Sequence, residues 1–501
     1  MNKITLIKLK QFISRYDTYI LFAFLLICTI GPIMFIKLAE SDEIWNFHNI
    51  QKIYNGFEIY KEANIIITPL FFYVGVLFCN LFGLTLLTFK VYNLFLISTL
   101  IVLVYKIFIT LKISKLKSLI YSLIIYIPTI YIGTVGANYN VLVAIFFLIG
   151  LQISINESKF KSKTFTVLQS IIIFLIFLTK HNVALYYIFG LIMSEVFLCK
   201  SSYKTLLKSI ITKVAIAIIF IISYLIILYF NGSLYNFINY TVLGIPEFSN
   251  NFFVETDAIV SIGIMCIIIL VSLMTLFYKN NSINISDEIK INIVKLMTFG
   301  VCTEFMAYPI ANLYHSIIGA YIIFILGFYL FDIIFAGYLD KFKKYLKILA
   351  FLILISLIIY SGYNFINYIR FIISDKSEKI EIYEYTIVTK ELKEKIIYID
   401  NYIKYKESLG VNVVIFSGHA GVYMLPLGKS NGNMDLPFLG NMGKNGEEEM
   451  IKKLDSLKNT EILIVRDEDK LFWQESSTIR KHIIEKYKLY GQIEDFNIYV
   501  L

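Results

Sequence analysis

The sequence lacks the residue patterns that build disulfide networks, zinc clusters and nucleotide sites. Its five cysteines include no CxxC motif and no cluster with histidine, so we interpret them as small buried hydrophobic residues. Residues 368–501 contain no cysteine, which excludes disulfides from that region. No GxGxxG or Walker pattern occurs, and we therefore expect no nucleotide site. Charged residues are also scarce, at 17%.

Hydrophobic residues are abundant instead. They make up 57% of the chain, and the mean hydropathy is +0.70, whereas soluble domains are about 45–50% apolar. A helix that crosses a bilayer needs about 20 mostly apolar residues. The apolar runs predict a mainly α, polytopic helical bundle with about eleven transmembrane helices. These helices are expected at 18–38, 84–105, 118–135, 139–155, 164–179, 183–199, 210–230, 258–278, 291–308, 316–338 and 348–367.

The basic residues alternate between loops. With a cytoplasmic N-terminus, lysine clusters fall in every predicted inner segment, and the outer loops before residue 368 hold little besides Lys52, Lys61 and Lys180. The net charge of +9 is therefore topogenic, and we expect no nucleic-acid partner. The first apolar stretch is long and lacks a small-residue cleavage site, which favours a retained span over a signal peptide. We expect a multi-pass protein of the cell membrane.

One apolar segment conflicts with this topology. Counting residues 65–82 as a span would place every later lysine cluster outside. We therefore expect an interfacial or partly re-entrant helix there, within a long outer loop at 38–83. A second long outer loop is expected at 231–257. Functional residues on a membrane scaffold concentrate in such loops.

Residues 1–367 are predicted to form the membrane module, and 368–501 a small extracytoplasmic α/β domain. In the second region charges become frequent and apolar runs shorten. The patterns predict helices at 385–408, 446–457 and 477–487, and strands at 411–416, 461–465 and 496–501. Strands that alternate with helices indicate a mainly parallel sheet.

The strongest local signal is an acid pair directly after the first predicted span. Asp42 and Glu43 are followed by an aromatic-rich amphipathic stretch that begins at Trp45. An acid pair at a membrane boundary can also be the solvated start of a loop. On composition alone that simpler interpretation is the stronger one, but the aromatic stretch that follows weakens it.

With the residues that follow it, this pair resembles a known family. The acid pair, then Gly56 and Tyr60, Pro69-Leu70 and Leu81-Phe82-Gly83, is similar to the first outer loop of polyprenyl-phosphate-sugar-dependent glycosyltransferases of the GT-C superfamily. That superfamily includes protein O-mannosyltransferases, aminoarabinose transferases and RgtA/B/C/D-like enzymes. Further similar stretches are Leu178-Thr179-Lys180-His181-Asn182, Tyr308-Pro309 with His315, and Asn431-Gly432-Asn433 with Gly440-Asn441 and Gly443.

The resemblance implies an inverting sugar transfer. A polyprenyl-phosphate sugar would be the donor, and an envelope glycan, lipid or protein the acceptor. It places Asp42 as the carboxylate that takes the acceptor proton and Glu43 as the residue that orients it or binds acceptor, although the order of the pair could be reversed. Candidates for the donor phosphate are Lys180, His181, His315 and Lys61, with Lys180 the best. A plain interfacial charge at Lys180 and a helix-cap histidine at His315 are the simpler alternatives.

Two further positions bear on the chemistry. Many members of the family carry a second acid where this chain has Asn138-Tyr139-Asn140, so we expect no metal ion or other cofactor; a divalent metal is possible but unsupported. Glu304 falls inside a predicted span, where it is expected to line the cavity or to pair with a neighbour such as Lys180. Glu195 and Asp332, nearer predicted inner ends, are expected to snorkel or cap helices.

Two other functions remain as alternatives. The chain could be a transporter or flippase of envelope glycolipids, but it shows no internal repeat of the kind common in such folds. It could also be a non-enzymatic receptor or scaffold, which would not need the acid pair.

Overall fold

The computed structural model describes residues 3–38, 42–198, 203–249, 253–277, 285–308, 310–375, 379–435, 437, 441–466 and 476–500. The chain divides into two compact units, which are described separately. The first unit is Met1–Ile36, Asn93–Phe220 and Val254–Tyr368. The second is Lys37–Tyr92, Ile221–Phe253 and Ile369–Leu501.

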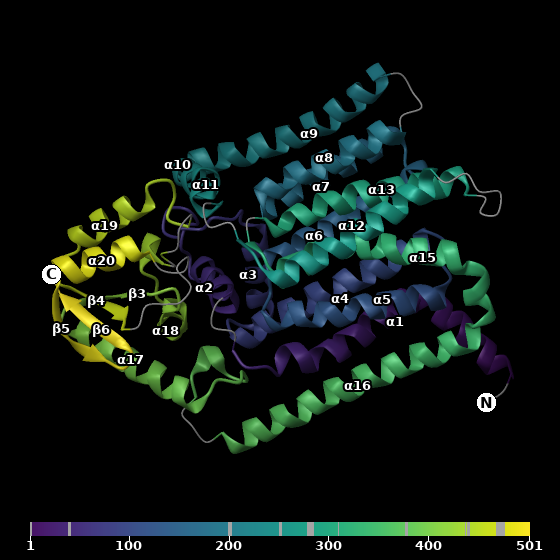
Figure 1. The fold of residues 1–501 in the computed structure, drawn as a ribbon. Coiled ribbons are helices and arrows are strands. Elements are labelled where there is room, and N and C mark those ends of the chain that lie inside the picture. Colours follow the sequence, from purple (N-terminus) through teal and green to yellow (C-terminus); the bar gives the residue numbers. More distant parts are fainter. Residues whose placement is uncertain are drawn as a thin grey trace. The chain divides into compact units, whose positions relative to one another are not determined.

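Long apolar helices build the first unit (Figure 1), and parts of three of them, α4, α9 and α16, belong to the second unit. Saturated helical hydrogen bonding is what a hydrocarbon environment demands of the backbone. The helices are α1 (Lys3–Met34), α4 (Leu86–Thr110), α5 (Lys115–Thr134), α6 (Tyr139–Ile155), α7 (Ser162–Thr179), α8 (His181–Leu198), α9 (Tyr203–Phe230), α12 (Thr256–Phe277), α13 (Asp287–Glu304), α14 (Leu313–Gly319), α15 (Tyr321–Lys341) and α16 (Lys343–Ser374). Short turns lie at η1 (Glu157–Lys159) and η3 (Phe305–Ala307), and short strands at β1 (Phe253–Val254) and β2 (Ile310–Ala311).

The predicted membrane fold is confirmed: the described chain is mostly helical and polytopic. Eight of its helices are long and apolar enough to cross a bilayer, or nine if α14 and α15, bent by 58°, form one broken span. Each of the eleven predicted spans lies largely on a helix. Two fall short of a regular span, because α6 has only 17 residues and α13 carries charges such as Lys290 and Lys295.

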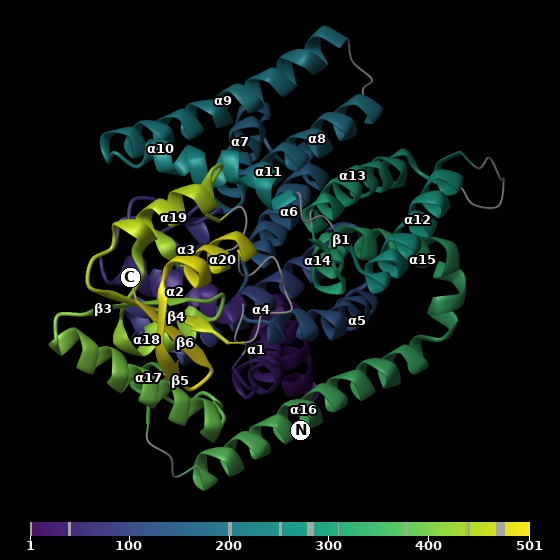
Figure 2. The same cartoon turned by 60° about the vertical axis from the view of Figure 1, so that its left-hand side comes forward.

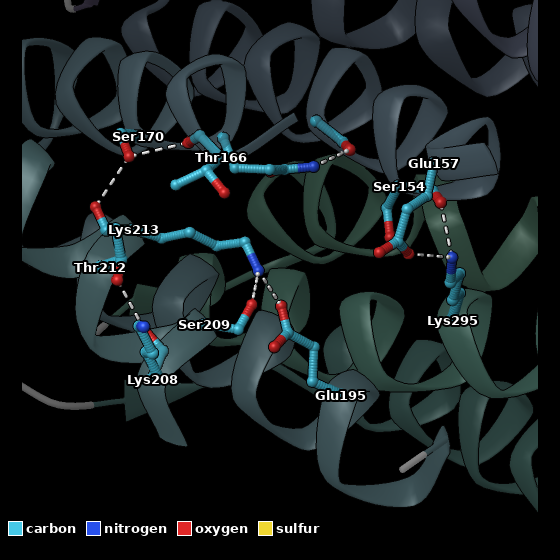
Figure 3. Close-up of polar contacts among 12 residues, drawn as sticks. Ser154, Glu157, Thr166, Ser170, Glu195, Lys208, Ser209, Thr212, Lys213 and Lys295 are labelled. Atoms are coloured by element: carbon cyan, nitrogen blue, oxygen red, sulfur yellow. Dashed lines mark hydrogen bonds and ion pairs between the residues drawn. The ribbon is translucent and has the colours of Figure 1, made fainter. Parts of the chain in front are cut away.

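Ion pairs join neighbouring helices of the first unit (Figure 3). Lys213 of α9 pairs with Glu195 of α8 and donates to Ser209 Oγ at 2.8 Å. Lys295 of α13 donates to the Ser154 carbonyl at 2.5 Å and lies 3.3 Å from Glu157. Glu195, which was expected to snorkel or to cap a helix, forms an ion pair with a buried lysine.

Asp332 of α15 is held in the same way. Its Oδ1 lies 3.0 Å from Lys117 Nζ and accepts from the Tyr121 hydroxyl at 3.3 Å. Its expected snorkelling or capping role is also replaced by an ion pair. Lys117, Lys213 and Lys295, which lie toward the predicted inner sides of the spans, thus have acidic partners on other elements of the first unit.

The second unit contains a four-stranded sheet of order β3-β4-β6-β5 (Figure 1). The strands are β3 (Asn412–Phe416), β4 (Thr460–Val465), β5 (Lys488–Ile493) and β6 (Phe496–Val500). Only β3 and β4 pair in parallel, whereas β4–β6 and β6–β5 are antiparallel. The predicted mainly parallel sheet is therefore wrong, because a hairpin that joins β5 to β6 supplies the other half.

Helices cover both faces of this sheet (Figure 2). On one face, α19 (Gly446–Ser456) and α20 (Ser477–Lys486) bury Leu454 and Ile483 against Ile462 and Ile464. On the other, α17 (Lys390–Ser408) sends Tyr402 and Lys406 to Glu461, at 2.5 and 2.6 Å. The alternation along β4 follows from the two-residue period of a strand.

The remaining elements of the second unit come from the two long loops and the C-terminal region. They are α2 (Asp42–Tyr54), α3 (Leu70–Phe82), α10 (Leu234–Phe237), a π-helical turn η2 (Ile238–Leu243), α11 (Gly244–Ser249), η4 (Glu381–Tyr383), α18 (Ala420–Leu427) and η5 (Gly432–Met434). At 13 residues, α3 is about 20 Å long and too short to cross about 30 Å of hydrocarbon. Its length agrees with the prediction that 65–82 is not a regular span.

The glycine–asparagine stretch near residue 440 joins these loops. Asn441 is fully buried, and its Oδ1 accepts from the Ile66 backbone N–H at 3.2 Å. Gly443 has a φ of +85°, and a Cβ there would lie 2.6 Å from Asn239 Nδ2. Only glycine combines that backbone conformation with so close an approach. Gly440 and Pro309, which belong to the motifs noted in the sequence, lie outside the described residues.

Candidate active site

The acid pair opens α2 in the second unit. Asp42 and Glu43 occupy the first helical turn, where the helix dipole favours negative charge. Glu43 is 1% exposed, and its Oε1 lies 3.1 Å from Nζ of Lys90, which is also fully buried. The charge of Glu43 is thus compensated within the protein.

Asp42 has a different environment. Its side chain is partly exposed, and among the described residues it forms no ion pair. Burial of the carboxyl raises the pKa of Asp42 to about 6. A carboxylate with that pKa is ionised at neutral pH and is a stronger base than an ordinary aspartate. Of the two acids, Asp42 is the one whose charge is available for a reaction.

A second buried ion pair lies farther along the same helix. Lys52 Nζ is 2.5 Å from Asp435 Oδ2, and both side chains are less than a tenth exposed. Although burial opposes it, Lys52 together with His48 and Ser430 holds the pKa of Asp435 below its ordinary value. His48 Nε2 lies 2.8 Å from the Lys429 carbonyl oxygen, and burial lowers the pKa of His48 to about 4.

Beside α2, a small pocket opens next to the Lys52–Asp435 pair. It is lined by Ile44, Trp45, His48, Asn49 and Lys52 of α2, by Asn64, by Ser417 and Gly418 of the loop after β3, by Ala420 and Gly421 of α18, and by Asp435. All of these residues belong to the second unit. The cavity volume is about 10 Å³. The pocket therefore has room for one water-sized group.

Lys61 lies in a turn of the second unit and is 38% exposed. Its Nζ is 2.5 Å from Glu58 Oε2. An exposed lysine with an adjacent glutamate is an ordinary surface ion pair. Nothing in this geometry distinguishes Lys61 as a phosphate ligand.

The other basic candidates belong to the first unit. Lys180 lies between α7 and α8, where a break between two spans was predicted, and its backbone is extended. Its Nζ donates to Asn140 Oδ1 at 2.9 Å and lies 5.5 Å from the centre of the Tyr139 ring. Burial lowers the pKa of Lys180 to about 8, so the ammonium is still mostly protonated at neutral pH. A neutral amide, not a carboxylate, thus faces this cation.

The two candidate histidines occupy neighbouring elements of the first unit. His315 of α14 places Nδ1 2.8 Å from Asn312 Oδ1, and the same oxygen caps the helix. His315 also lies within electrostatic range of Lys180. The local hydrogen bonds of His315 therefore agree with the simpler alternative, a histidine at a helix cap. His181 is the first residue of α8, with its ring 6.4 Å from the Phe177 ring.

Glu304 ends α13 without the partner suggested for it. Both of its carboxylate oxygens are buried and accept no hydrogen bond within the described part of the chain. Lys180 is bonded to Asn140 instead, so a Glu304–Lys180 pair is not formed. Gly319 lies against Glu304, where an added Cβ would be 2.8 Å from Oε2 and 2.9 Å from Cα.

Several of these residues were missed in the sequence. Lys90 was not among the candidates, although a single lysine within an apolar run is itself a signal of buried pairing. The Lys52–Asp435 pair joins residues far apart in the chain, and no sequence pattern connects them. Within the described ranges, no three side chains of histidine, cysteine, aspartate or glutamate lie close enough together to hold a metal ion.

Comparisons with known proteins identify the fold. No protein-family model and no curated protein sequence matches the chain. Among solved structures, ArnT from Cupriavidus metallidurans in the apo state is similar with a TM-score of 0.56 and 10% identity, over 97% of this chain and 98% of that one. The oligosaccharyltransferase of Archaeoglobus fulgidus, in complex with Zn and sulfate, gives a TM-score of 0.48 and 10% identity over 95% and 72% of the two chains.

Proposed function

We propose that this chain, which has the GT-C fold, is an inverting membrane glycosyltransferase that uses a polyprenyl-phosphate sugar. A fold does not by itself determine an activity, so the proposal depends on the candidate site. The observation that carries it is the contrast between the two adjacent acids. Glu43 is neutralised by Lys90, whereas Asp42 retains an available carboxylate with a raised pKa.

In the proposed reaction, Asp42 accepts the proton of an acceptor hydroxyl as the oxygen attacks the anomeric carbon of the donor sugar. The new glycosidic bond forms as the bond between that carbon and the phosphate oxygen breaks. The electron pair leaves with the polyprenyl phosphate. Lys180 is proposed to stabilise the charge that develops on the phosphate, since it is a protonated lysine with no carboxylate partner among the described residues.

Glu43 is proposed to hold the start of α2 in place rather than to take part in the reaction. Its ion pair with Lys90 fixes the first turn of α2 from the side opposite the pocket. The order of the acid pair in this proposal is therefore the one in which Asp42 is the base. The acceptor is an envelope glycan, lipid or protein.

The experiment that tests the function uses purified protein with polyprenyl-phosphate hexoses and pentoses, and acceptor membranes from cells that lack the protein. We expect Asp42→Asn to lower the transfer rate by about 10²–10⁴-fold, the usual contribution of a general base. Membrane insertion and thermal unfolding should match those of the parent. Wild-type rates in Asp42→Asn would exclude the proposed mechanism.

The proposed orientation has its own experiment. Lys458 lies in an exposed loop of the second unit, and Ser162 is exposed at the start of α7. We expect an impermeant thiol reagent on intact cells to label Lys458→Cys and not Ser162→Cys, relative to the parent with its native cysteines. The opposite pattern would place the C-terminal region in the cytoplasm.

A further inference from the structure

The pocket beside α2 contains two buried amide groups with unused hydrogen-bonding capacity. Asn49 is 1% exposed, and its Oδ1 accepts from Lys52 at 3.4 Å, which leaves Nδ2 without an acceptor among the described residues. Asn64 is 2% exposed, and its Nδ2 donates to the carbonyls of Asp435 and Asn441, which leaves Oδ1 without a donor there. Both residues line the pocket.

A free donor and a free acceptor in one small pocket match a group that can both accept and donate a hydrogen bond. A hydroxyl accepts one hydrogen bond and donates another, so it can satisfy Asn49 and Asn64 together. The cavity of about 10 Å³ has room for one such group and no more. Leaving both buried amides unsatisfied is costly, which favours a ligand that completes them.

Trp45 supplies the second part of the site. It lines the same pocket and is partly exposed, and its ring stands edge-on to Phe72 with centroids 6.4 Å apart. A fixed indole offers a flat apolar surface for a ring while its neighbours bind polar groups. The C–H faces of a sugar ring are apolar and its rim carries hydroxyls, so a sugar suits both parts.

The pocket and the acid lie on one face of α2. Residues 42, 45, 49 and 52 recur at helical spacing, whereas Glu43 faces Lys90 and Gln51 faces α18. Asp42 and Asn49 are seven residues apart, or about 10 Å along the helix. A short oligosaccharide can bridge that length with one ring at Trp45 and a hydroxyl at Asp42.

We propose that Trp45, Asn49 and Asn64 form a carbohydrate-binding subsite that holds the acceptor, so that the acceptor of the proposed transfer is a glycan. The statement that the bound sugar is the acceptor rests on the proposed function. The sugar-binding site itself rests only on the pocket. Of the three acceptor classes in the proposed function, this subsite favours a glycan over a protein or a simple lipid.

Trp45 provides a direct readout, because the chain has only two tryptophans. Substituting the other, Trp473→Phe, leaves Trp45 as the only indole in the full-length protein; Trp473 lies outside the described residues. The detergent-solubilised variant is titrated with glucose, mannose, N-acetylglucosamine and their short oligomers, up to about 100 mM for the weakest single rings. We expect at least one sugar to shift the Trp45 emission saturably, and a threonine-containing tripeptide to leave it unchanged.

Two leucine substitutions on α2 provide a matched pair. Asn49→Leu removes the pocket donor, whereas Gln51→Leu removes an amide that donates to the Leu425 carbonyl outside the pocket. We expect Asn49→Leu to weaken sugar binding about tenfold, as for one lost hydrogen bond, and Gln51→Leu to leave it unchanged. No saturable response to any sugar would overturn the proposal. Equal affinities in two folded leucine variants would also overturn it and assign the amides a structural role.

The titration separates this inference from the proposed function. Asp42→Asn should abolish transfer while sugars still shift Trp45. Transfer that depends on Asp42 without any response of Trp45 would refute the subsite alone. A response of Trp45 in a protein whose transfer does not depend on Asp42 would refute the mechanism alone.

Discussion

In the first unit, charged residues in one part of α8 and α13 have partners of opposite charge, whereas those at the other ends of these helices have none among the described residues. Toward one end of α8 and along α13, Glu195 and Lys295 have partners of opposite charge, Lys213 and Glu157. At the other ends of the same helices, Lys180 and Glu304 have none within the described chain. On α8 the two ends are 15 residues or about 22 Å apart. A buried charge without a counter-charge is unfavourable, so its retention is a signal of function rather than of packing.

The second unit repeats this contrast at shorter range. Glu43 is paired with Lys90, and the next residue on α2, Asp42, forms no ion pair among the described residues. The paired groups hold elements together, and the unpaired ones are available to a ligand. Substitutions in the two sets should therefore have opposite profiles in activity and in stability.

The largest expected effect is on transfer activity. Lys180→Met should lower the transfer rate by about 10²–10³-fold, because it removes the proposed stabilisation of the leaving phosphate. Lys213→Met, at the paired end of α8, should leave the rate of the folded protein unchanged. Rates are compared per correctly folded molecule after size-exclusion chromatography. Loss of transfer in Lys213→Met alone would reverse the assignment of the two ends.

The same two substitutions should affect the stability of the protein in the opposite order. Lys213→Met leaves Glu195 without its partner, and the side chain of Glu195 is only 22% exposed. We expect a loss of about 2 kcal/mol, less than for a fully buried pair. Lys180→Met removes a cation that has no counter-charge and should not destabilise. Thermal unfolding in detergent measures both, and an equal loss in the two variants would contradict the comparison.

The pH dependence of transfer should report Asp42. Since the pKa of Asp42 is raised to about 6, the carboxylate needed as a base becomes protonated as the pH falls below that value. We expect kcat/KM to fall about tenfold per pH unit below pH 6 and to be level above it, until Lys180 begins to lose its proton near pH 8. A profile that is flat between pH 7 and pH 5 would exclude Asp42 as the titrating base.

The last prediction concerns the packing around Glu304. Gly319→Ala places a methyl group 2.9 Å from Glu304 Cα, so the helix ends must shift, at about 1–3 kcal/mol. Gly263→Ala, within α12, is the matched control because nothing lies within 4 Å of its added Cβ. That substitution should be neutral or slightly stabilising. Thermal unfolding of the two alanine variants checks this, and similar midpoints would mean that the close contact is unimportant.

The membrane helices could be predicted because each depends on a local property. Most of α9, from Val214 to Phe230, is an uninterrupted uncharged and mainly apolar run, and Lys180 marks the break between α7 and α8 in the sequence itself. Strand β5 was missed because it is an exposed edge strand without clear alternation. The hairpin that follows it uses Glu494 at a φ of +46°, where asparagine or glycine is the recognisable signal.

The candidate site was only partly predictable for the same reason. Asp42, Glu43 and Lys180 were identified from local motifs, but their partners were not. Lys90 meets Glu43, and Asp435 meets Lys52, across separations that sequence periodicity does not encode. Whether a charge is compensated depends on such long-range contacts. The sequence alone therefore left the order of the acid pair open.

The buried pair of Lys52 and Asp435 has a consequence for protein engineering. Because Lys52 belongs to α2 and Asp435 to the C-terminal region, removing residues 369–501 would leave the buried ammonium group of Lys52 without its ion-pair partner. A chimera that exchanges the C-terminal region with that of a relative must therefore also carry α2 from the same parent. The two stretches must therefore be exchanged together, although most of the chain separates them in the sequence.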